Sequence, residues 1–490
     1  MDNNAFLTLI VFLPAVGAIA IALGSSKAQT IKLTAVLFTL ATFALTIALF
    51  CLYDRSPGAP QFQFGMPLDW IPSIGASYFL GVDGLSLTMV LLTGLLGIIG
   101  VLVSLNIQLR LKEYFIWLLV LETGIMGVFI SLDLLLFFLF WEVELIPMYM
   151  LISIWGSGRK EYSAIKFVLY TLAGSALMLA GILTIYFTAG TFDITMIGQK
   201  LGLVAEPIIP LSAMFFLLLF GFAVKLPVFP FHTWLPDAHT DAPTAVSVIL
   251  AGVLLKMGGY GIIRLCVGFF PEAARSYAPY IAAFAVVSVL YGAAVTLRQT
   301  DLKRLIAYSS ISHMGYVLLG IFALRQLSLT GATLQMFSHG IITGLLFAMV
   351  GLVYDHTHQR QIPLLGGLVR QMPVIAIVFS IAGLAALGLP STSGFAAEFM
   401  VFMGSMSSDM SIMRIYTILG ILAIVVTAGY ILWMLERVFY REPRGEYDGV
   451  RDASPLEMVP IFSFVIAIMV VGIYPRILTD VIGPMFLGWG

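Results

Sequence analysis

Long apolar runs recur along the whole chain, and they limit its fold more than any other feature of the sequence. A helix needs about 20 predominantly apolar residues to cross a bilayer, and about fourteen segments meet that requirement. They lie at about 4–23, 31–53, 78–105, 113–131, 134–156, 163–189, 208–234, 244–266, 277–297, 303–323, 330–354, 372–404, 413–440 and 455–475. With 60% apolar residues, 10% charged residues and a mean hydropathy of +1.02, a soluble enzyme is excluded. We predict an all-α polytopic membrane protein of about 14 transmembrane helices.

Charged residues are few, and their signs balance. The 25 lysines and arginines against 26 aspartates and glutamates give a formal net charge of -1, which provides no basic field for nucleic acid. The two cysteines, Cys51 and Cys266, are too few for an iron–sulfur cluster, and no P-loop, dinucleotide fingerprint or haem-ligand pattern is present. We predict that this chain holds no nucleic acid, metal or cofactor, so an ion gradient or a partner subunit must drive it.

The distribution of basic residues predicts the orientation in the membrane. Most lysines and arginines lie in or beside the connections that follow odd-numbered segments, whereas fewer, Arg264 among them, follow even-numbered segments. Connections rich in lysine and arginine face the inside, so both termini are predicted on the outer side, periplasmic or lumenal. The first apolar run follows Met1 closely, without the basic region of a signal peptide, and is predicted to be a retained helix.

Two of the segments contain residues that break helices. The seventh reads AVKLPVFPFHTWLPDAH over 223–239, and the twelfth reads LGLPSTSGFAAEF over 387–399. Pro227, Pro230 and Pro390 each remove a backbone donor and cannot lie inside a regular helix. Ordinary proline kinks are the alternative explanation, but broken helices beside ionisable residues in both halves of a chain are typical of inverted-repeat transporters.

The spacing of the two breaks predicts an internal repeat. Segments 4–8 and 9–13 would form two five-helix units, and an odd number of membrane crossings inverts the second unit relative to the first. The predicted division is residues 1–112 for the N-terminal helices 1–3, 113–266 and 267–440 for the two inverted repeats, and 441–490 for the C-terminal helix 14.

Lys256 lies in the middle of the eighth segment. At 1.5 Å per residue it is roughly 15 Å from either membrane interface, and its side chain is too short to reach the headgroups from there. We therefore predict a buried polar site in which Lys256 releases and takes up a proton near neutral pH.

Lys225 in the seventh segment also places a charge within the bilayer. An unpaired charge there is costly, so we predict an ion pair with Glu142, which lies in FLFWEVELIPMYML over 138–151. Movement of Lys225 toward or away from Glu142 would change the charge felt by Lys256 and would make Lys256 a switchable proton carrier. A static ion pair that only joins two helices is the alternative.

Further ionisable residues extend this polar line. Glu144 is two positions from Glu142, on another side of the helix, so we rank Glu144 and Glu122 below it. The line continues with His232 after the break in the seventh segment, then with His313 and His339, and ends with Glu398 in the second half. Histidines can relay protons near physiological pH, although an interhelical hydrogen bond is the alternative at His313. Metal binding is disfavoured because no histidine pair combines i, i+4 spacing with an acidic third ligand.

Several strings of the sequence resemble the antiporter-like membrane subunits of complex I, and most closely the M-type (chain 4) members. They are FWEVELIPMYMLISIWG (140–156), AVKLPVFPFHTWLPDAHTDAPTAVSVILAGVLLKMGGYGIIR (223–264), LKRLIAYSSISHMGY (302–316), FSHG (337–340), LPSTSGFAAEF (389–399) and GVDGLS (81–86). The resemblance covers essentially the whole chain. It implies a proton-translocating subunit of NADH:quinone oxidoreductase that has no redox centre of its own.

The resemblance also assigns roles by residue-wise match. It implies that Glu142 and Lys225 form the family's ion pair and that Lys256 is the central proton-carrying lysine. It further implies that His339 connects the two halves and that Glu398 ends the channel. FMN, iron–sulfur clusters and quinone would lie in partner subunits, and L-type and N-type subunits would be membrane neighbours. The membrane would be a bacterial inner membrane or a thylakoid.

Three alternatives remain open. The string WEVELIP also resembles the D-type subunit of photosynthetic complex I, which takes electrons from ferredoxin, so the electron donor is not fixed. The chain could instead exchange ions in a multisubunit Na+/H+ antiporter of the Mrp type, but such subunits, like L-type subunits, usually have lysine where this chain has Glu398. L-type subunits also carry a long lateral helix, whereas few residues follow Pro475. A packing subunit with purely structural charges is the third alternative.

Overall fold

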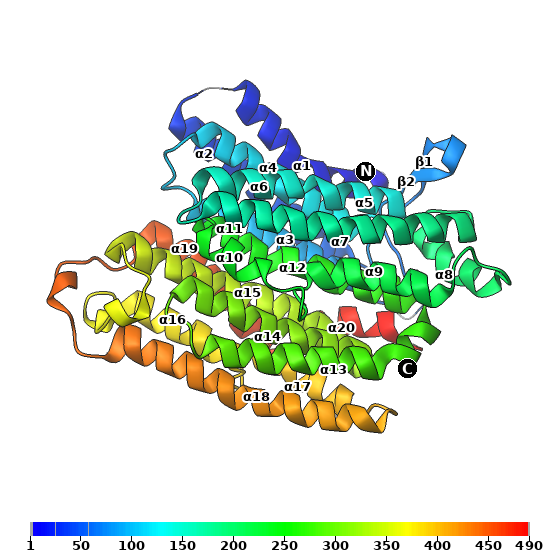
Figure 1. Ribbon diagram of the computed structural model, residues 1–490. Coiled ribbons are helices and arrows are strands. Elements are labelled where there is room, and N and C mark those ends of the chain that lie inside the picture. Colours follow the sequence, from blue (N-terminus) through cyan, green and yellow to red (C-terminus); the bar gives the residue numbers. More distant parts are fainter. Residues whose placement is uncertain (1–2, 25, 57, 489–490) are drawn as a thin grey trace. The chain divides into compact units, whose positions relative to one another are not determined.

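The computed structural model describes residues 3–24, 26–56 and 58–488, and helices dominate them (Figure 1). The chain forms two compact units. Unit 1 comprises Met1–Val101, Leu105–Leu226 and Val253–Ala278, and unit 2 comprises Leu102–Ser104, Pro227–Gly252 and Pro279–Gly490. The units differ from the predicted repeats because 227–252 belongs to unit 2, although it lies in the first predicted repeat.

Twelve helices in the described part of the chain are long and apolar enough to cross a membrane, which confirms an all-helical polytopic membrane protein. The spans are α1 (Asn3–Leu23), α2 (Ala28–Leu52), α3 (Gly84–Val103), α4 (Leu111–Ile130), α5 with α6 (Leu134–Val143, Leu145–Trp155), α7 (Lys160–Ala189), the segment of α11 (Thr244–Ile249), η2 (Leu250–Leu254), α12 (Leu255–Gly261) and η3 (Ile262–Val267), then α13 (Pro271–Thr296), α14 (Leu302–Phe322), α15 (Gln326–Thr357), α18 with η6 (Ser411–Leu435, Glu436–Tyr440) and α19 (Pro455–Ile473). The turns η2, η3 and η6 are π-helical.

The two other predicted segments are divided into helices shorter than a full span. They are α9 (Leu211–Lys225) with α10 (Trp234–Asp241), and α16 (Pro373–Ala386) with α17 (Ser393–Met406). Pro227 and Pro230 lie in the first gap and Pro390 lies in the second, where each removes a backbone donor that a continuous helix would need. Long spans therefore number twelve in the described residues, compared with the fourteen segments predicted.

The fifth predicted segment is also interrupted, which the sequence analysis did not predict. α5 ends at Val143 and α6 begins at Leu145, with Glu144 at the junction. Pro147 lies in the first turn of α6, has no N–H to bond the carbonyl of Val143, and crowds that carbonyl with its ring. Buried side chains nevertheless recur at helical spacing across the junction, at Phe140, Trp141, Glu144 and Met148.

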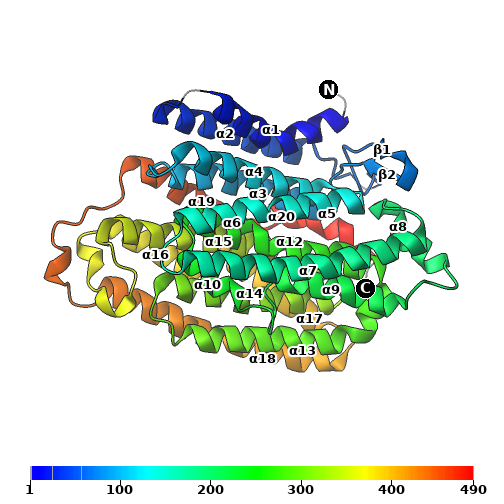
Figure 2. The same ribbon diagram turned by 45° about the horizontal axis from the view of Figure 1, so that its top comes forward.

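The polar connections carry short elements of their own. The connection between α2 and α3 includes an antiparallel hairpin of β1 (Leu68–Ile71) and β2 (Ala76–Tyr78), joined by the turn η1 (Pro72–Ile74) (Figure 2). The other short helices are α8 (Ile194–Leu203), η4 (Ile362–Leu364), η5 (Leu368–Arg370), η7 (Gly445–Tyr447), α20 (Arg476–Ile482) and η8 (Gly483–Phe486).

Asp133 ties the hairpin to the start of α5. Its Oδ1 accepts hydrogen bonds from the backbone N–H groups of Leu135 and Leu136 at 2.9 and 3.1 Å, so it is the N-cap of α5. Its Oδ2 accepts from the backbone N–H of Ser77 at 3.0 Å. Burial raises the pKa of the Asp133 carboxyl, although these donors act in the opposite direction. This N-cap therefore determines that α5 begins at Leu134.

Close helix packing in both units depends on small residues. In unit 1, a Cβ added to Gly221 of α9 would lie 2.8 Å from the carbonyl oxygen of Gly174 in α7. In unit 2, a Cβ on Gly404 of α17 would lie 2.3 Å from the backbone nitrogen of Ser328 in α15. Side chains would separate these helix pairs, which is why small residues are favoured where membrane helices touch.

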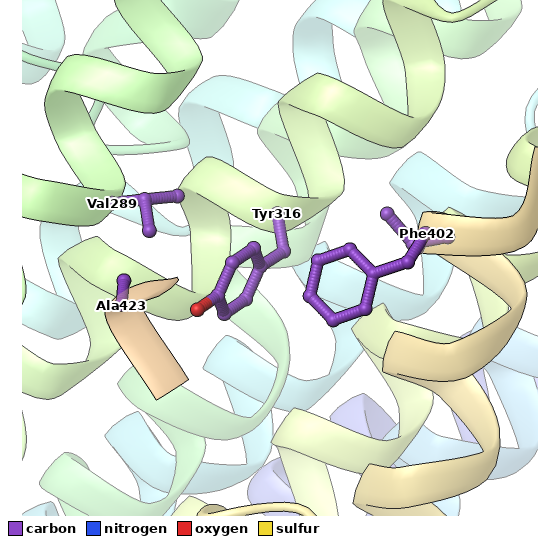
Figure 3. Packing of buried hydrophobic residues seen from close by; sticks show 5 residues of the cluster. Val289, Tyr316, Phe402 and Ala423 are labelled. Carbon is purple, nitrogen blue, oxygen red and sulfur yellow. The ribbon is translucent and has the colours of Figure 1, made fainter. Parts of the chain in front are cut away.

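Aromatic packing fixes α14 against α17 and α18 in unit 2. The ring of Tyr316 meets the ring of Phe402 edge to face, with 5.3 Å between centroids and 89° between planes (Figure 3). Val289 and Ala423 lie in the same buried cluster. The hydroxyl of Tyr316 donates to the carbonyl of Gly420 at 3.1 Å, so the one polar atom of this ring is satisfied.

Candidate functional site

Lys225 forms a buried ion pair with Glu144 in unit 1. Lys225 is the last residue of α9, and Glu144 lies at the junction of α5 and α6. The Nζ of Lys225 donates to Oε1 of Glu144, and each side chain is at most 2% exposed. The same Nζ lies 5.6 Å from the ring centroid of Trp141 and 5.3 Å from that of Phe167, which adds cation–π stabilisation. Both side chains of the pair are therefore buried in the protein.

The prediction that Glu142 is the partner of Lys225 is wrong in this structure. Glu142 is partly exposed, and its Oε1 has no hydrogen-bond partner among the described residues. The helical repeat is the physical reason, because Glu144 lies three and four positions after the buried Trp141 and Phe140, whereas Glu142 lies on a partly exposed side. Glu144, ranked second from the sequence, thus holds the place expected for Glu142. The two carboxylates do lie on different sides, as their spacing predicts.

Lys256 lies in α12 and is fully buried at 0% exposure. Glycines bring its helix close to the end of α9: a Cβ on Gly258 would lie 2.6 Å from the backbone nitrogen of Leu226, and one on Gly261 would lie 2.4 Å from the ring of Phe222. The π-helical turns η2 and η3 flank α12, and such turns occur frequently at functional sites. The helix of Lys256 therefore touches the turn that follows Lys225.

Glu122 is a second buried carboxyl of unit 1. It lies in α4 at 3% exposure, and its Oε1 has no hydrogen-bond partner within the described residues. The carboxyl occupies the space left by Gly97 of α3, where an added Cβ would lie 2.2 Å from Oε1. Gly97 is therefore the residue that admits Glu122 between α3 and α4.

We expect Gly97→Ala to destabilise the protein by about 1–3 kcal/mol, the usual cost of overpacking an interior. The measurement is the apparent melting temperature of the purified membrane complex that contains the chain. Gly202→Ala in α8 is the matched control, because no atom lies within 4 Å of the Cβ that it adds. Adding Glu122→Ala to Gly97→Ala should recover most of the loss by removing the crowded carboxyl. An unchanged melting temperature for Gly97→Ala would contradict the packing described here.

A second polar site lies in unit 2, at the second broken helix. Nδ1 of His313 in α14 is 3.2 Å from Oε1 of Glu398 in α17, and Nε2 of Gln335 in α15 donates to the same oxygen at 3.4 Å. The ring centroid of His339 in α15 is 5.6 Å from that of His313. These side chains line a small cavity together with Ser309, Ile342, Thr343, Ala385, Ala386 and Gly394. The cavity has room for about one water molecule.

The break between α16 and α17 forms one wall around Glu398. Gly388 has a φ of +80°, a conformation that favours glycine, and a Cβ there would lie 3.0 Å from Oε2 of Glu398. Ser391 also has a positive φ, +75°. The chain thus leaves its helical path beside the carboxylate and lets the backbone approach it.

His232 lies apart from this cavity, in the gap between α9 and α10. Its ring is stacked near Phe229 at 5.7 Å and meets Tyr291 edge to face at 4.9 Å. His232 is not among the residues that line the cavity. The structure therefore groups the predicted residues in two sets, Lys225 with Glu144 in unit 1, and His313 and His339 with Glu398 in unit 2. Across residues 3–24, 26–56 and 58–488, no group of three or more His, Cys, Asp or Glu side chains is arranged to hold a metal ion.

Asp83 and Arg264 form a buried ion pair that the sequence analysis missed. Nη1 of Arg264 donates to Oδ2 of Asp83 at 2.5 Å, and Nη2 donates to Oδ1 at 2.6 Å. Arg264 was assigned to a polar connection from its position near the end of a segment, whereas it is only 5% exposed. The signal was present, because Asp83 in GVDGLS is a charge beside an apolar run and needs a partner.

Comparison with known proteins bears on what this arrangement does. The family described as "NADH:quinone oxidoreductase/Mrp antiporter, TM" matches residues 131–427. NADH-quinone oxidoreductase subunit M of Rhodobacter capsulatus is 40% identical over 98% of this chain and 95% of its own length. NAD(P)H-quinone oxidoreductase chain 4 1 of Synechococcus elongatus is 42% identical over 98% of this chain and 90% of its own length.

Solved structures share the fold. A chain of respiratory complex I from Thermus thermophilus with bound NADH has a TM-score of 0.88 and 28% identity, covering 99% of this chain and 100% of that one. A chain of the Mrp complex from Dietzia sp. has a TM-score of 0.86 at 19% identity, covering 99% and 97%, which is a likeness of fold alone. On the family match and the full-length relatives, the chain belongs to the NADH:quinone oxidoreductase/Mrp antiporter family of membrane proteins.

Proposed function

We propose that this chain is a proton-translocating, antiporter-like subunit of the membrane arm of complex I. It would couple electron transfer in partner subunits to proton pumping without holding a redox centre itself. The observation that carries the proposal is the buried Lys225–Glu144 pair next to the helix of Lys256. Full-length similarity to subunit M and chain 4 proteins of quinone oxidoreductases supports it.

Lys256 is the proton carrier of the first half in this proposal. Inside the protein, charges interact far more strongly than in water. When Lys225 moves away from Glu144 toward the turn that contacts α12, its positive charge would favour loss of the proton from Lys256. When the pair closes again, Lys256 would take up a proton. A buried lysine with a movable charged neighbour is thus a two-state element that redox chemistry elsewhere can bias.

His313, His339 and Glu398 continue the route in the second half. The cavity water would bridge the histidines, which can exchange protons near neutral pH, and Glu398 would be the last protein group to hold the proton. We further propose that the twelve long spans and two broken segments represent fourteen membrane segments with inverted repeats at segments 4–8 and 9–13. The two breaks beside Lys225 and Glu398 support this assignment.

The surroundings of the chain follow from the same proposal. L-type and N-type antiporter-like subunits would lie beside it in the bilayer, and FMN, iron–sulfur clusters and quinone would be held by partner subunits. Both termini would face the periplasm or the thylakoid lumen, as the basic residues predict. NADH and ferredoxin both remain candidate electron donors.

Ion exchange in an Mrp-type antiporter is the second candidate function. The description of the matching family, which names the Mrp antiporter beside NADH:quinone oxidoreductase, favours it. Glu398 argues against it, since the resemblance to the family implies a lysine at this place in Mrp subunits. Neighbouring genes would separate the candidates, because genes for iron–sulfur and quinone-binding subunits accompany the first and a short antiporter operon accompanies the second.

A direct test uses the complex purified through a tag on this chain and reconstituted into lipid vesicles, with the electron-donor side facing outward. We expect NADH or reduced ferredoxin, added with quinone, to acidify the vesicle interior in a manner abolished by an uncoupler. A sodium pulse in the absence of any electron donor should cause no pH change. Alkalinisation of the interior by sodium alone, as protons leave in exchange for entering sodium, with no acidification from the donors, would assign the chain to the antiporter class instead.

A further inference from the structure

The Asp83–Arg264 pair is the strongest buried interaction that the proposed function does not use. Asp83 precedes α3 and is 1% exposed, and Arg264 lies in the π-helical turn η3. Two parallel hydrogen bonds of 2.5 and 2.6 Å join the planar guanidinium to the carboxylate. This bidentate arrangement is a strong one for an arginine–carboxylate pair. The pair lies in the same span as Lys256, eight residues away, which is about 12 Å along a helix.

Hydrogen bonds satisfy both oxygens of Asp83 and both Nη atoms of Arg264, whereas Nε of Arg264 has no hydrogen-bond partner among the described residues. Nη2 of Arg264 also donates to Oγ of Ser86 at 3.1 Å, and the backbone N–H of Ser86 donates to Oδ1 of Asp83 at 3.0 Å. The hydroxyl of Tyr260 lies 3.3 Å from Oγ of Ser86 and donates to the carbonyl of Phe129 at 3.2 Å. Both oxygens of Asp83 therefore already accept hydrogen bonds from the protein.

Two aromatic rings lie close to the guanidinium of Arg264. The centroids of Phe62 and Tyr260 lie 5.1 and 5.3 Å from Cζ of Arg264. Tyr260 packs edge to face on Phe129 at 5.2 Å and stacks near Phe137 at 6.5 Å. Tyr260 is one helical turn from Lys256 and one from Arg264, so its ring lies between them along the span.

This arrangement suits a barrier better than a relay. An arginine guanidinium cannot release its proton inside a protein, so it cannot pass one on. Asp83 is held by charge-assisted hydrogen bonds, and each of its oxygens already accepts at least one hydrogen bond. A fixed arginine and a closely packed apolar ring layer are two devices by which membrane proteins exclude protons and water.

The geometry points to a proton barrier made of Asp83, Arg264 and Tyr260, which we name the Asp83–Arg264 plug. The plug closes unit 1 at the end where α3 begins and η3 ends, the end that the basic residues predict to be outer. Lys256 then exchanges protons only with the opposite end and with the second half of the chain. This inference rests on the proposed function, because limiting proton access to one side of Lys256 matters only if Lys256 carries protons.

The test measures passive proton leak through the assembled complex in sealed lipid vesicles that contain a pH-sensitive dye. No electron donor is added, and a potassium gradient with valinomycin supplies the voltage. We expect Arg264→Gln and Asp83→Asn to raise the leak by about tenfold or more, while Arg264→Lys, which retains the charge, raises it less. Arg110→Gln is the matched control, since Arg110 and Glu113 form an exposed ion pair in the same unit.

A second substitution separates a specific leak from general damage. Adding Lys256→Ala to Arg264→Gln should return the leak to the level of the unaltered protein, because the opened route runs through Lys256. The neutral pair Asp83→Asn with Arg264→Gln leaves no unpaired charge and keeps the test available if a single variant fails to assemble. Assembled variants that do not leak, or a leak that persists without Lys256, would overturn the barrier. Failure of Lys256→Ala to affect pumping in the otherwise unaltered complex would instead overturn the proposed function.

Discussion

Replacing Lys256 with alanine is expected to abolish coupled proton pumping while the complex still assembles. Lys256 is fully buried in α12 and is the one basic residue of that helix, so the proposed route depends on it to carry the proton. Loss of a group that transfers protons typically costs a factor of about 10² to 10⁴ in rate. We therefore expect donor-driven acidification of vesicles to fall by at least about 100-fold, and electron transfer to fall with it because the two are coupled.

Two control variants define what the loss means. Lys256→Arg keeps a positive charge but cannot release a proton at any physiological pH, so it should fail as Lys256→Ala does. Lys27→Ala removes an exposed lysine of unit 1 and should pump normally. Assembly is followed on native gels in every case. Normal pumping in an assembled Lys256→Ala complex would show that the buried charge is structural and would contradict the proposed mechanism.

Most of the fold could be predicted from apolar run length and proline position. A span needs a fixed length of apolar chain in a bilayer, so the boundaries of α4, α7 and α19 lie within a few residues of the predicted segments. Pro230 and Pro390 marked real helix breaks because proline lacks the donor that a helix needs. The hairpin of β1 and β2 and helix α8 were not predicted, since polar connections carry no comparable periodicity.

The candidate site could be predicted in composition but not in pairing. Lone charges at Lys225, Lys256 and Glu398 stand out in apolar surroundings, and all three are buried. The partner of Lys225 was misassigned because Glu144, rather than Glu142, shares the helix face of the buried Phe140, Trp141 and Met148. Which carboxylate pairs with Lys225 depends on which side of the α5–α6 segment faces α9. Tertiary packing sets that orientation.

Position and packing, rather than residue type, also explain why Asp83 and Arg264 were missed. Arg264 lies close to the end of its segment, where an arginine ordinarily reaches the headgroups. The π-helical turn η3 instead belongs to the interior of unit 1, where Asp83 and Ser86 accept its hydrogen bonds. No periodicity in the sequence predicts a π-helical turn, so the direction of Arg264 could be found only in three dimensions.

The two glutamates of the string WEVELIP should differ sharply when each is replaced by glutamine. Glu144→Gln leaves Lys225 buried without its carboxylate, and breaking a buried ion pair from one side costs about 3–5 kcal/mol. Glu142→Gln changes a partly exposed side chain, for which substitutions usually cost within about 0.5 kcal/mol. We expect Glu144→Gln to lower the melting temperature of the complex and to reduce pumping by at least about tenfold.

A double substitution separates stability from function at this pair. Glu144→Gln with Lys225→Met removes both charges, so no buried charge is left unpaired and much of the melting temperature should return. Pumping should not return, because the proposed mechanism needs a charge at Lys225 that can approach or leave Lys256. Recovery of pumping together with stability would mean that the pair only joins α9 to the α5–α6 junction. Equal losses of pumping for Glu142→Gln and Glu144→Gln would mean that both carboxylates pair with Lys225 in turn. Glu142 would then replace Glu144 as the partner of Lys225 when the Lys225–Glu144 pair opens.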